Sequence, residues 1–185
     1  MSRTVFLDRD GTLNRDVDFV RSPAQLEVLP GVADALQRLD AAGYRLVVVT
    51  NQSGIARGYF DEAMLARIHG ELHQRLGGLP LAWLHCPHLP AAVGGYGGDC
   101  ACRKPKPGLL HQARDLLGVA FAGGALIGDS ARDLLPARGL GLRTVHVRSG
   151  KPFAAEQAQL RAEGFVPDHE AADLAAAVDW LLARS

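Results

Sequence analysis

The sequence predicts an α/β fold built on a doubly wound parallel sheet, and three observations support this prediction. Short apolar runs that suit buried strands recur along the chain, and helical apolar patterns lie between them. Polar residues follow directly after several of these runs, as in sheets whose strand ends form a ligand site. Runs that are apolar on both faces are typical of parallel strands covered by helices on each side. Because strand and helix alternate, we expect one Rossmann-like domain spanning residues 1–185.

Each expected element has its own signal in the sequence. Strands are expected at residues 4–7, 45–50, 81–85, 125–128 and 142–147, which are rich in Val, Leu and Ile. Helices are expected around residues 32–39, after Asp61, from Pro107 to Gly118, and over 154–163 and 171–183. Asp61 can cap a helix, Pro107 suits a first helical turn, and Gly118 suits a helix end. The Pro- and Gly-rich stretch 87–98 is interpreted as a long loop, and connections of this length commonly bind something or move.

Composition and charge argue against several kinds of partner. The 20 basic residues balance the 20 acidic residues, so the net charge of +0 does not favour nucleic acid or an anionic membrane. No stretch approaches the roughly 20 apolar residues of a membrane span, and residues 1–4 lead into the first strand without an apolar leader. We therefore expect a cytoplasmic protein. The three cysteines cannot all pair within one chain, which favours reduced thiols with a local role.

Two carboxylates, Asp8 and Asp10, follow the first strand at a spacing of two residues. Side chains two residues apart project from the same face of an extended segment, so both can point into one crevice beyond the strand end. Such a pair suits a nucleophile and a neighbouring acid that share a metal ion. Because a short motif of this kind is also common in solvated turns, the interpretation requires partners elsewhere in the chain.

Three further strand ends supply those partners. Thr50 follows the second strand, Lys104 lies beyond the third, and Asp129 follows the fourth. Because ligands bind outside the carboxyl ends of the strands in open α/β sheets, these side chains are expected to converge. Asp8, Asp10 and Asp129 would then form an oxygen cluster suited to Mg²⁺. Lys104 would supply positive charge opposite that cluster, and backbone amides would donate to phosphate oxygens.

This ordered set resembles the haloacid dehalogenase superfamily of phosphatases, whose members combine Asp-x-Asp-Gly-Thr, a Thr or Ser after the second strand, a Lys, and a late Gly-Asp pair. The resemblance implies a role for each matching position. Asp8 would attack phosphorus to form an aspartyl-phosphate, and Asp10 would protonate the leaving group and later activate water. Mg²⁺ would bind Asp8, the Asp10 backbone carbonyl and Asp129. Thr50 and Lys104 would hold the transferring phosphoryl group and the nucleophile.

Two residues close to Asp129 have alternative roles. Asp133 resembles the further acid of the superfamily, which implies that it orients Lys104 or a metal-bound water. The alternative is a solvated acid in the first turn of a helix. Ser130 stands where the superfamily has a residue that touches substrate, and its alternative role is to cap the helix that follows Asp129.

The long loop carries a ligand set for a second metal. The set comprises Cys86, His88, Cys100 and Cys102. Three thiols and one imidazole satisfy tetrahedral Zn²⁺ and leave no position open, so the site would be structural and would pin the loop 86–102. Because Cys102 directly precedes Arg103 and Lys104, folding around zinc would also set where these two cations point. The alternatives are that cysteine serves as a buried small hydrophobe and that His85 is a rival ligand.

The cysteine-rich segment and the Arg103-Lys104-Pro105 that follows it look like one branch of the superfamily, which contains heptose bisphosphate phosphatases and histidinol-phosphate phosphatases. Both are small enzymes without a large cap domain, which agrees with the absence of a sizeable insertion after Thr12. The long loop resembles the heptose enzymes more closely. The resemblance therefore implies Mg²⁺-dependent hydrolysis of the C7 phosphate of a heptose 1,7-bisphosphate, which would leave heptose 1-phosphate for nucleotide-sugar and lipopolysaccharide synthesis. Histidinol phosphate is the alternative substrate.

The same resemblance assigns contacts with the substrate. They are expected from Asp16, Val17, Asp18, Phe19, Asn51, Gln52, Ser53, Arg103 and Ser130. Arg103 is the candidate for holding the phosphate that is not hydrolysed, because a guanidinium engages phosphate oxygens in pairs. Arg57 and Arg132 could also reach anions, although exposed arginines are commonly ordinary surface charges.

A different class of function stays open at this point. The Cys/His loop could act as a zinc finger that contacts nucleic acid or a protein, with the aspartates as a vestigial site. The neutral charge balance argues against nucleic acid. The small relatives without a cap suggest a monomer, and either heptose anomer is compatible with these residues.

Overall fold

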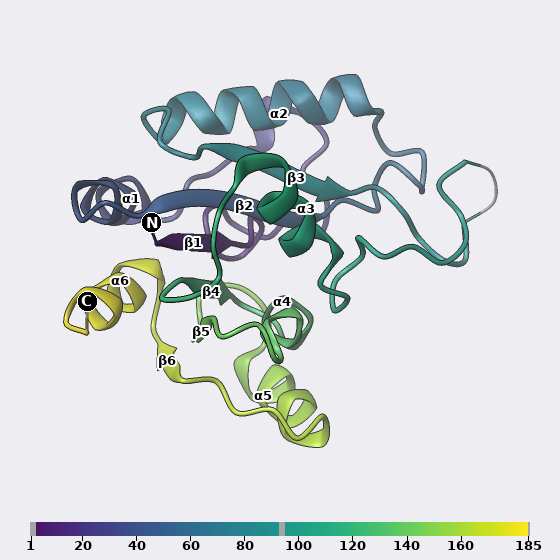
Figure 1. Ribbon diagram of the computed structural model, residues 1–185. Helices are drawn as coiled ribbons and strands as arrows, with labels where there is room; N and C mark the ends of the chain where they lie inside the picture. Colours follow the sequence, from purple (N-terminus) through teal and green to yellow (C-terminus); the bar gives the residue numbers. More distant parts are fainter. Residues whose placement is uncertain (1–2, 93–94, 185) are drawn as a thin grey trace.

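The protein forms one six-stranded parallel sheet in the strand order β3-β2-β1-β4-β5-β6 (Figure 1). The computed structural model describes residues 3–92 and 95–184, so Met1, Ser2, Val93, Gly94 and Ser185 lie outside the described part. The strands are β1 Thr4–Leu7, β2 Arg45–Asn51, β3 Ala82–Cys86, β4 Ala125–Gly128, β5 Arg143–Val147 and β6 His169–Ala171. The helices are α1 Val32–Ala41, α2 Glu62–Arg75, α3 Gly108–Leu117, α4 Ala131–Leu134, α5 Phe153–Ala162 and α6 Leu174–Leu182. The predicted fold class is confirmed.

The sheet is covered by helices on both faces, because side chains alternate from face to face along each strand. Val5 and Leu7 of β1 pack on one face with α1, α2 and α6, whereas Phe6 packs on the other face with α3, α4 and α5. Figure 1 shows the two helical layers on either side of the strands. All four residues of β1 and all four of β4 are buried, as expected for the centre of a parallel sheet.

The register of the central strands brings two acidic positions side by side. Leu7 at the end of β1 pairs with Ile127 of β4, and the amide of Asp8 donates to the carbonyl of Ile127 at 3.0 Å. Asp8 therefore lies directly beside the end of β4, close to Asp129. This adjacency follows from the strand order, in which the first and fourth strands are neighbours.

Several helix signals read from the sequence are confirmed by the structure. The Asp61 side chain accepts from the Met64 amide at 2.8 Å and caps α2. Gly118 ends α3 with a φ of 62°, a left-handed conformation that glycine adopts without steric cost. Pro107 occupies the cap position just before α3, one residue earlier than a first helical position.

The carboxyl-terminal region differs from the expectation. The helix expected over 171–183 begins only at Leu174, where Asp173 caps it by accepting from the Ala176 amide at 2.9 Å. Ala171 belongs instead to β6, which was not predicted. This strand has only three residues and includes His169 and Glu170, so it lacks the apolar run that marks the buried strands. A short strand at the sheet edge does not need that run.

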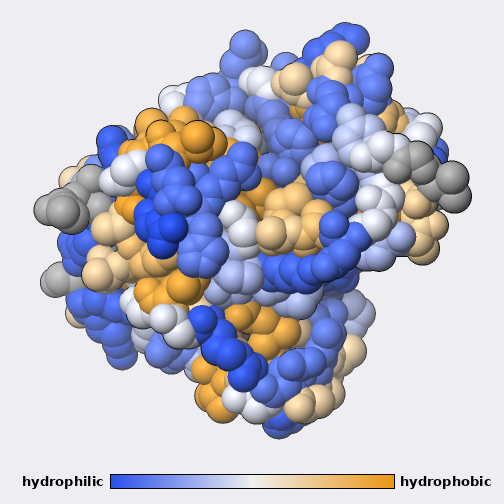
Figure 2. Space-filling model, turned by 45° about the vertical axis from the view of Figure 1, so that its right-hand side comes forward, coloured by the Kyte–Doolittle hydropathy of each residue, from blue (hydrophilic) through white to orange (hydrophobic). Residues whose placement is uncertain are grey.

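The surface shows no single apolar face among the parts that Figure 2 draws. Hydrophobic atoms lie in several separate patches surrounded by hydrophilic side chains. The large hydrophobic residues exposed among the described residues are Val17, Tyr59, Leu81, Leu116 and Val166. None of the helices in the described ranges combines the length and apolarity that a bilayer crossing requires.

Candidate active site

Polar side chains from several strand ends converge on one pocket of about 220 Å³. Its lining includes most of the residues predicted from the sequence: Asp8, Asp10, Asp16, Asp18, Phe19, Thr50, Asn51, Ser53, Arg103, Lys104, Asp129 and Ser130. Arg57, Arg132, Asp133 and Lys151 also line it. Two predicted contact residues, Val17 and Gln52, do not line the pocket. Val17 is exposed elsewhere on the surface, and Gln52 is buried and donates to the Thr50 hydroxyl. The expected convergence at the carboxyl ends of the strands is therefore observed.

Lys104 is the centre of a buried ion-pair cluster. Its ammonium donates to Asp8 Oδ1 at 2.6 Å, forms an ion pair with Asp133 Oδ1 at 2.6 Å, and donates to the Val49 carbonyl at 2.8 Å. Lys104 is only 4% exposed, so the ammonium has little access to water. A buried ammonium needs such partners, because removing it from water is costly. Lys104 thus fixes one oxygen of Asp8 and leaves the other oxygen available.

Burial and mutual repulsion shift the pKa values of the carboxylates in this cluster. Burial, together with the nearby charge of Asp133, raises the pKa of Asp8 to about 7. Burial and the charges of Asp133 and Asp8 raise the pKa of Asp129 to about 9. Burial opposes the ionised form of Asp133 too, but Lys104 and the Ser130 hydroxyl hold the pKa of Asp133 below its usual range. Lys104 in turn has a raised pKa, because the attraction of Asp133 and Asp8 outweighs burial.

The Asp129 carboxylate packs against two glycines, Gly11 and Gly150, at positions where any other residue would clash with it. A Cβ atom at Gly11 would lie 2.3 Å from Asp129 Oδ2, and one at Gly150 would lie 1.9 Å from the same oxygen. Gly11 also has a φ of 86°, a left-handed conformation that disfavours other residues. The amide of Lys151 donates to Asp129 Oδ2 at 2.7 Å, and the ring of His146 contacts the Asp129 carbonyl at 3.1 Å. The backbone therefore fixes this carboxylate closely.

The donor set fits a divalent cation. Carboxylate oxygens of Asp8, Asp129 and Asp133 lie within 4.8 Å of one another, and all three residues are buried. If all three carboxylates are ionised, the single ammonium of Lys104 leaves a surplus of two negative charges. Hard oxygen donors that retain room for water and phosphate are the environment that Mg²⁺ prefers. A divalent ion would also relieve the repulsion that raises the pKa values of Asp8 and Asp129.

The carboxylate of Asp10 belongs to a different network from the Asp8 cluster. Arg9 donates to both Asp10 oxygens over distances of 2.8–3.2 Å, and Asn14 and Gln52 each donate at 2.9 Å. The Asp10 side chain retains 23% of its exposure and lines the pocket. Its carboxylate is not among the mutually close oxygens of the acidic cluster. The cluster was expected to comprise Asp8, Asp10 and Asp129, whereas in the structure Asp133 takes the place of the Asp10 carboxylate. The role of the Asp10 backbone carbonyl as a metal ligand, which the resemblance implies, stays a prediction.

Two amide side chains after β2 tie the site together. Gln52 donates to the Thr50 hydroxyl at 2.9 Å as well as to Asp10, and so links these two groups. Asn51 exchanges two hydrogen bonds of 3.1 Å with the backbone of Lys104, one as donor and one as acceptor. Both residues were predicted to contact substrate. Asn51 lines the pocket and Gln52 does not, and both hold neighbouring residues of the site in place.

Ser130 and Asp133 start α4 as a capping box. The Ser130 amide donates to Asp133 Oδ2 at 3.1 Å, and the Ser130 hydroxyl donates to the same oxygen. Asp133 is 3% exposed, so the alternative of a solvated first-turn acid is wrong. Its other oxygen holds Lys104, which is the orienting role that the sequence suggested. Ser130 has the capping role and also lines the pocket.

The thiol-rich loop gathers its four predicted ligands. Ligand atoms of Cys86, His88, Cys100 and Cys102 lie within 4.8 Å of one another. The closest pair is Cys102 and Cys86, whose sulfurs are 3.1 Å apart, and the Cys86 and Cys100 sulfurs are 3.7 Å apart. Ligands around tetrahedral zinc lie roughly 3.5–3.8 Å apart, so the set is close to that geometry. The rival ligand His85 lies outside the group and contacts Glu62 at 2.8 Å.

Three groups that matter for the site were not found from the sequence. Lys151 lies beyond the end of β5, forms an ion pair with Asp16 across the pocket, and lines it. Applying the strand-end rule to the fifth strand would have indicated it. Arg9 and His69 contact each other at 3.2 Å, although they are 60 residues apart in the chain. No local pattern could have linked those two residues.

Comparison with known proteins places the chain in a family. The HAD-hydrolase-like family matches residues 101–177. A curated protein of Pasteurella multocida, named D-glycero-beta-D-manno-heptose-1,7-bisphosphate 7-phosphatase, is 42% identical over 84% of this chain and 87% of its own length. The chain belongs to the heptose bisphosphate phosphatase family of haloacid dehalogenase-like hydrolases. The resemblance inferred from the strand-end motifs is therefore confirmed.

Other members of the heptose bisphosphate phosphatase family match along nearly the whole chain. The protein of the same name from Bordetella bronchiseptica is 39% identical over 97% of this chain and 98% of its own length. The crystal structure of the D,D-heptose 1,7-bisphosphate phosphatase from that organism, complexed with magnesium and phosphate, superposes with a TM-score of 0.84. It covers 99% of both chains at 38% identity.

Proposed function

We propose that this protein is a Mg²⁺-dependent phosphatase that removes the C7 phosphate of D-glycero-β-D-manno-heptose 1,7-bisphosphate and leaves heptose 1-phosphate. The observation that carries the proposal is the buried cluster of Asp8, Asp129 and Asp133 around Lys104 in the strand-end pocket. Family members of about 40% identity are named for this reaction and for the β anomer. The B. bronchiseptica relative binds magnesium and phosphate. These names support one of the two anomers that the sequence left open.

In the proposed reaction the free oxygen of Asp8 attacks phosphorus and forms an aspartyl-phosphate, while the C7 oxygen leaves and takes a proton from Asp10. Lys104 holds the other oxygen of Asp8 and so fixes the direction of attack. Water then attacks the same phosphorus, the bond to Asp8 breaks, and the Asp10 carboxylate takes the proton of the water. Mg²⁺ held by Asp8, the Asp10 carbonyl and Asp129 would neutralise charge on the phosphoryl oxygens. The Thr50 hydroxyl would donate to one of these oxygens.

The rim of the pocket suits a substrate with a second phosphate. Arg57, Arg103 and Arg132 line it and offer guanidinium groups to the phosphate that is not hydrolysed. Arg103 is itself fixed, because it donates to the His88 carbonyl of the thiol-rich loop at 2.9 Å. A monophosphate such as histidinol phosphate would leave part of this positive rim without a partner. We therefore favour the bisphosphate as substrate.

We propose further that the loop 86–102 binds a structural zinc ion through Cys86, His88, Cys100 and Cys102. The close approach of their ligand atoms supports this, as does the absence of an open position in a set of four protein ligands. Elemental analysis of the purified protein is expected to find about one zinc per chain. A Cys100→Ser, Cys102→Ser variant should contain none. A folded wild-type protein without zinc would contradict the proposal.

We also infer that the chain is a single, minimally capped domain that acts as a monomer in the cytoplasm. Light scattering after size-exclusion chromatography tests the oligomeric state. A mass near the 19.7 kDa of one chain is expected. A mass near twice that value would contradict the monomer.

The activity is tested by measuring phosphate release from a panel of esters in the presence of Mg²⁺. The panel contains both anomers of heptose 1,7-bisphosphate, other sugar bisphosphates and histidinol phosphate. We expect the highest kcat/KM for the β-heptose bisphosphate. Higher kcat/KM for histidinol phosphate, or no release from any ester, would contradict the proposed function.

Asp8→Asn tests the mechanism within the same assay. It removes the nucleophile, so we expect phosphate release to fall at least about 10³-fold. Asp99→Asn is the matched control, because Asp99 is an exposed carboxylate paired with Lys106 and does not line the pocket. The control should keep wild-type turnover. Wild-type activity in Asp8→Asn would exclude an aspartyl-phosphate at this position.

A further inference from the structure

The carboxylate of Asp10, which lines the pocket, is held by the buried side chain of Arg9, which does not. The Arg9 guanidinium approaches both Asp10 oxygens, with its Nη2 at 2.8 and 2.9 Å and its Nε at 3.1 and 3.2 Å. Arg9 is 1% exposed and is among the largest fully buried side chains of the described chain. An arginine that engages both oxygens fixes the plane of a carboxylate as well as its position. The position and the plane of the Asp10 carboxylate are therefore both fixed by Arg9.

The remaining nitrogen of Arg9 contacts a second buried residue. Arg9 Nη1 lies 3.2 Å from Nε2 of His69, which is 7% exposed. A guanidinium can only donate, so His69 Nε2 must accept and the ring must be neutral. Burial lowers the pKa of His69 to about 2, and the charge of Arg9 acts in the same direction. Both the geometry and the burial of the ring thus make His69 a neutral acceptor for Arg9.

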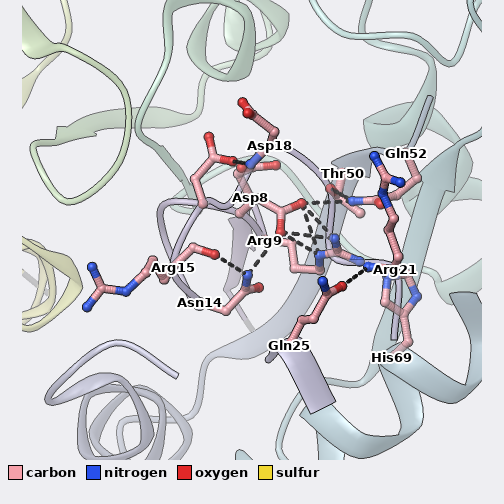
Figure 3. Close-up of polar contacts among 12 residues, drawn as sticks. Asp8, Arg9, Asn14, Arg15, Asp18, Arg21, Gln25, Thr50, Gln52 and His69 are labelled. Atoms are coloured by element: carbon pink, nitrogen blue, oxygen red, sulfur yellow. Dashed lines mark hydrogen bonds and ion pairs between the residues drawn. The ribbon is translucent and has the colours of Figure 1, made fainter. Parts of the chain in front are cut away.

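His69 is itself locked by the packing of α2 against β3. Its ring stacks on Trp83 with a centroid distance of 4.9 Å and an interplanar angle of 30°. The ring of His85 lies against it edge-on at 5.9 Å. Figure 3 shows the Arg9 side chain extending toward His69, which lies on α2. A contiguous series of contacts therefore runs from β3 and α2 through Arg9 to Asp10.

Three neighbouring side chains donate hydrogen bonds to the Asp10 carboxylate. Arg9, Asn14 and Gln52 each donate, so both oxygens of Asp10 act as acceptors. An acceptor held at the pocket wall suits the second half of the proposed reaction, in which a water molecule must lose its proton. Base catalysis of this kind contributes about 10²–10⁴-fold when the base is correctly placed.

We propose that Arg9, fixed by its contact with His69, positions Asp10 to accept the proton of the water that hydrolyses the aspartyl-phosphate. Arg9 and His69 are positioning residues, because neither lines the pocket. In this step the water oxygen bonds to phosphorus, the bond from phosphorus to the Asp8 oxygen breaks, and the proton passes to Asp10. The inference rests on the proposed phosphatase activity and deepens it.

The test uses p-nitrophenyl phosphate, whose leaving group needs no proton. In His69→Leu the guanidinium loses its acceptor, Asp10 is no longer held, and hydrolysis of the aspartyl-phosphate slows. We expect a rapid burst of nearly one p-nitrophenol per enzyme, followed by a steady rate about 10- to 100-fold below wild type. kcat and KM should fall together, while kcat/KM, which reports formation of the intermediate, should change little. A purely structural defect would lower kcat/KM and produce no burst.

Three further variants make the result decisive. His69→Gln restores an acceptor near the position of Nε2 and should recover most of the steady rate. Arg9→Lys keeps the positive charge but loses the two-oxygen contact, and it should show the same burst as His69→Leu. Gly70→Ala is the matched control, because Gly70 follows His69 on the same helix and an added Cβ would meet nothing within 4 Å. It should behave as wild type.

Each outcome decides between the proposals. Absence of a burst in Arg9→Lys would overturn the inference, even if His69→Leu failed to fold by circular dichroism. Equal loss of kcat/KM in His69→Leu and His69→Gln would overturn it as well. Failure of the proposed function would be seen separately, as absence of phosphate release by the wild-type protein from every ester tested.

Discussion

At the level of single residues, the sequence alone reveals the role of some side chains of the site and not of others. Asp8 and Asp129 directly follow strand ends, and Lys104 follows the long loop after the third strand, so their convergence was predictable. Arg9 and His69 were not predictable, because only the packing of α2 brings them together. An arginine between two acids looks like a surface charge until its burial is known.

Gly150 is important because it has no side chain, which leaves room for the Asp129 carboxylate. In Gly150→Ala the new Cβ would lie 1.9 Å from Asp129 Oδ2 and 2.7 Å from the Gly11 Cα. Asp129 must therefore move, and we expect the Mg²⁺ concentration for half-maximal activity to rise about 10- to 100-fold. Activity measured against Mg²⁺ concentration checks this. An unchanged Mg²⁺ dependence would show that Asp129 does not bind the ion.

The matched control for that change is Gly70→Ala. Gly70 lies inside α2, where an added Cβ would meet nothing within 4 Å. Alanine favours the helix over glycine, so the variant should gain about 0.5–1 kcal/mol in the free energy of unfolding and keep its Mg²⁺ dependence. Urea denaturation measures the first quantity.

At the scale of elements, apolar periodicity predicted the buried strands and failed at the edge. The bounds of β1 and β4 were predicted to the residue, because both are short runs buried on both faces. β6 was missed because His169 and Glu170 are only half-buried at the edge of the sheet and leave no apolar run. The start of α6 was set by the Asp173 cap, which shortens the predicted helix by three residues. Local side-chain chemistry thus decided the boundary that periodicity could not.

The thiol-rich loop is the element whose contribution can be tested by removing a metal ion. Arg103 donates to the His88 carbonyl, and Lys104 follows directly in the chain, so the loop sets the position of both cations. If the loop binds the proposed zinc ion, a zinc chelator with low affinity for Mg²⁺ is expected to lower both the melting temperature and kcat/KM, because the four ligands would lose the ion that holds them together. Thermal scans and phosphate release at saturating Mg²⁺ measure both effects. Restored activity after adding zinc is the control, and full activity after complete zinc loss would contradict the structural role.

At the scale of the whole molecule, strand order turns separate motifs into one site. Asp8 and Asp129 are 121 positions apart in the sequence, yet β1 and β4 are neighbours in the sheet. The sequence could predict that both lie at the same edge of a parallel sheet, but not that they are adjacent, because strand order depends on how the helices pack. The two acids then repel each other in a buried space, and this repulsion links metal binding to the stability of the fold.

The raised pKa values predict how the stability of the metal-free protein and its Mg²⁺ binding change with pH. The pKa of Asp8 is raised to about 7 and that of Asp129 to about 9 in the folded protein, against about 3.9 for aspartate in an unfolded chain. Between these limits the folded, metal-free protein binds protons that the unfolded chain has released. Its stability therefore falls as the pH rises through the range from about 4 to 9. Mg²⁺ requires the ionised carboxylates, so its binding releases these protons and strengthens as the pH rises.

We therefore expect Mg²⁺ to raise the melting temperature more at about pH 8 than at about pH 6. Thermal scans at one fixed Mg²⁺ concentration, with and without the ion at each pH, give the two shifts for comparison. Asp129→Asn removes the carboxylate with the highest pKa of the cluster, so it should abolish most of the Mg²⁺ effect at both pH values. The Gly70→Ala variant should show the wild-type difference, because its substitution lies away from the cluster. Equal shifts at the two pH values, or a larger shift at the lower pH, would mean that these carboxylates do not bind the ion.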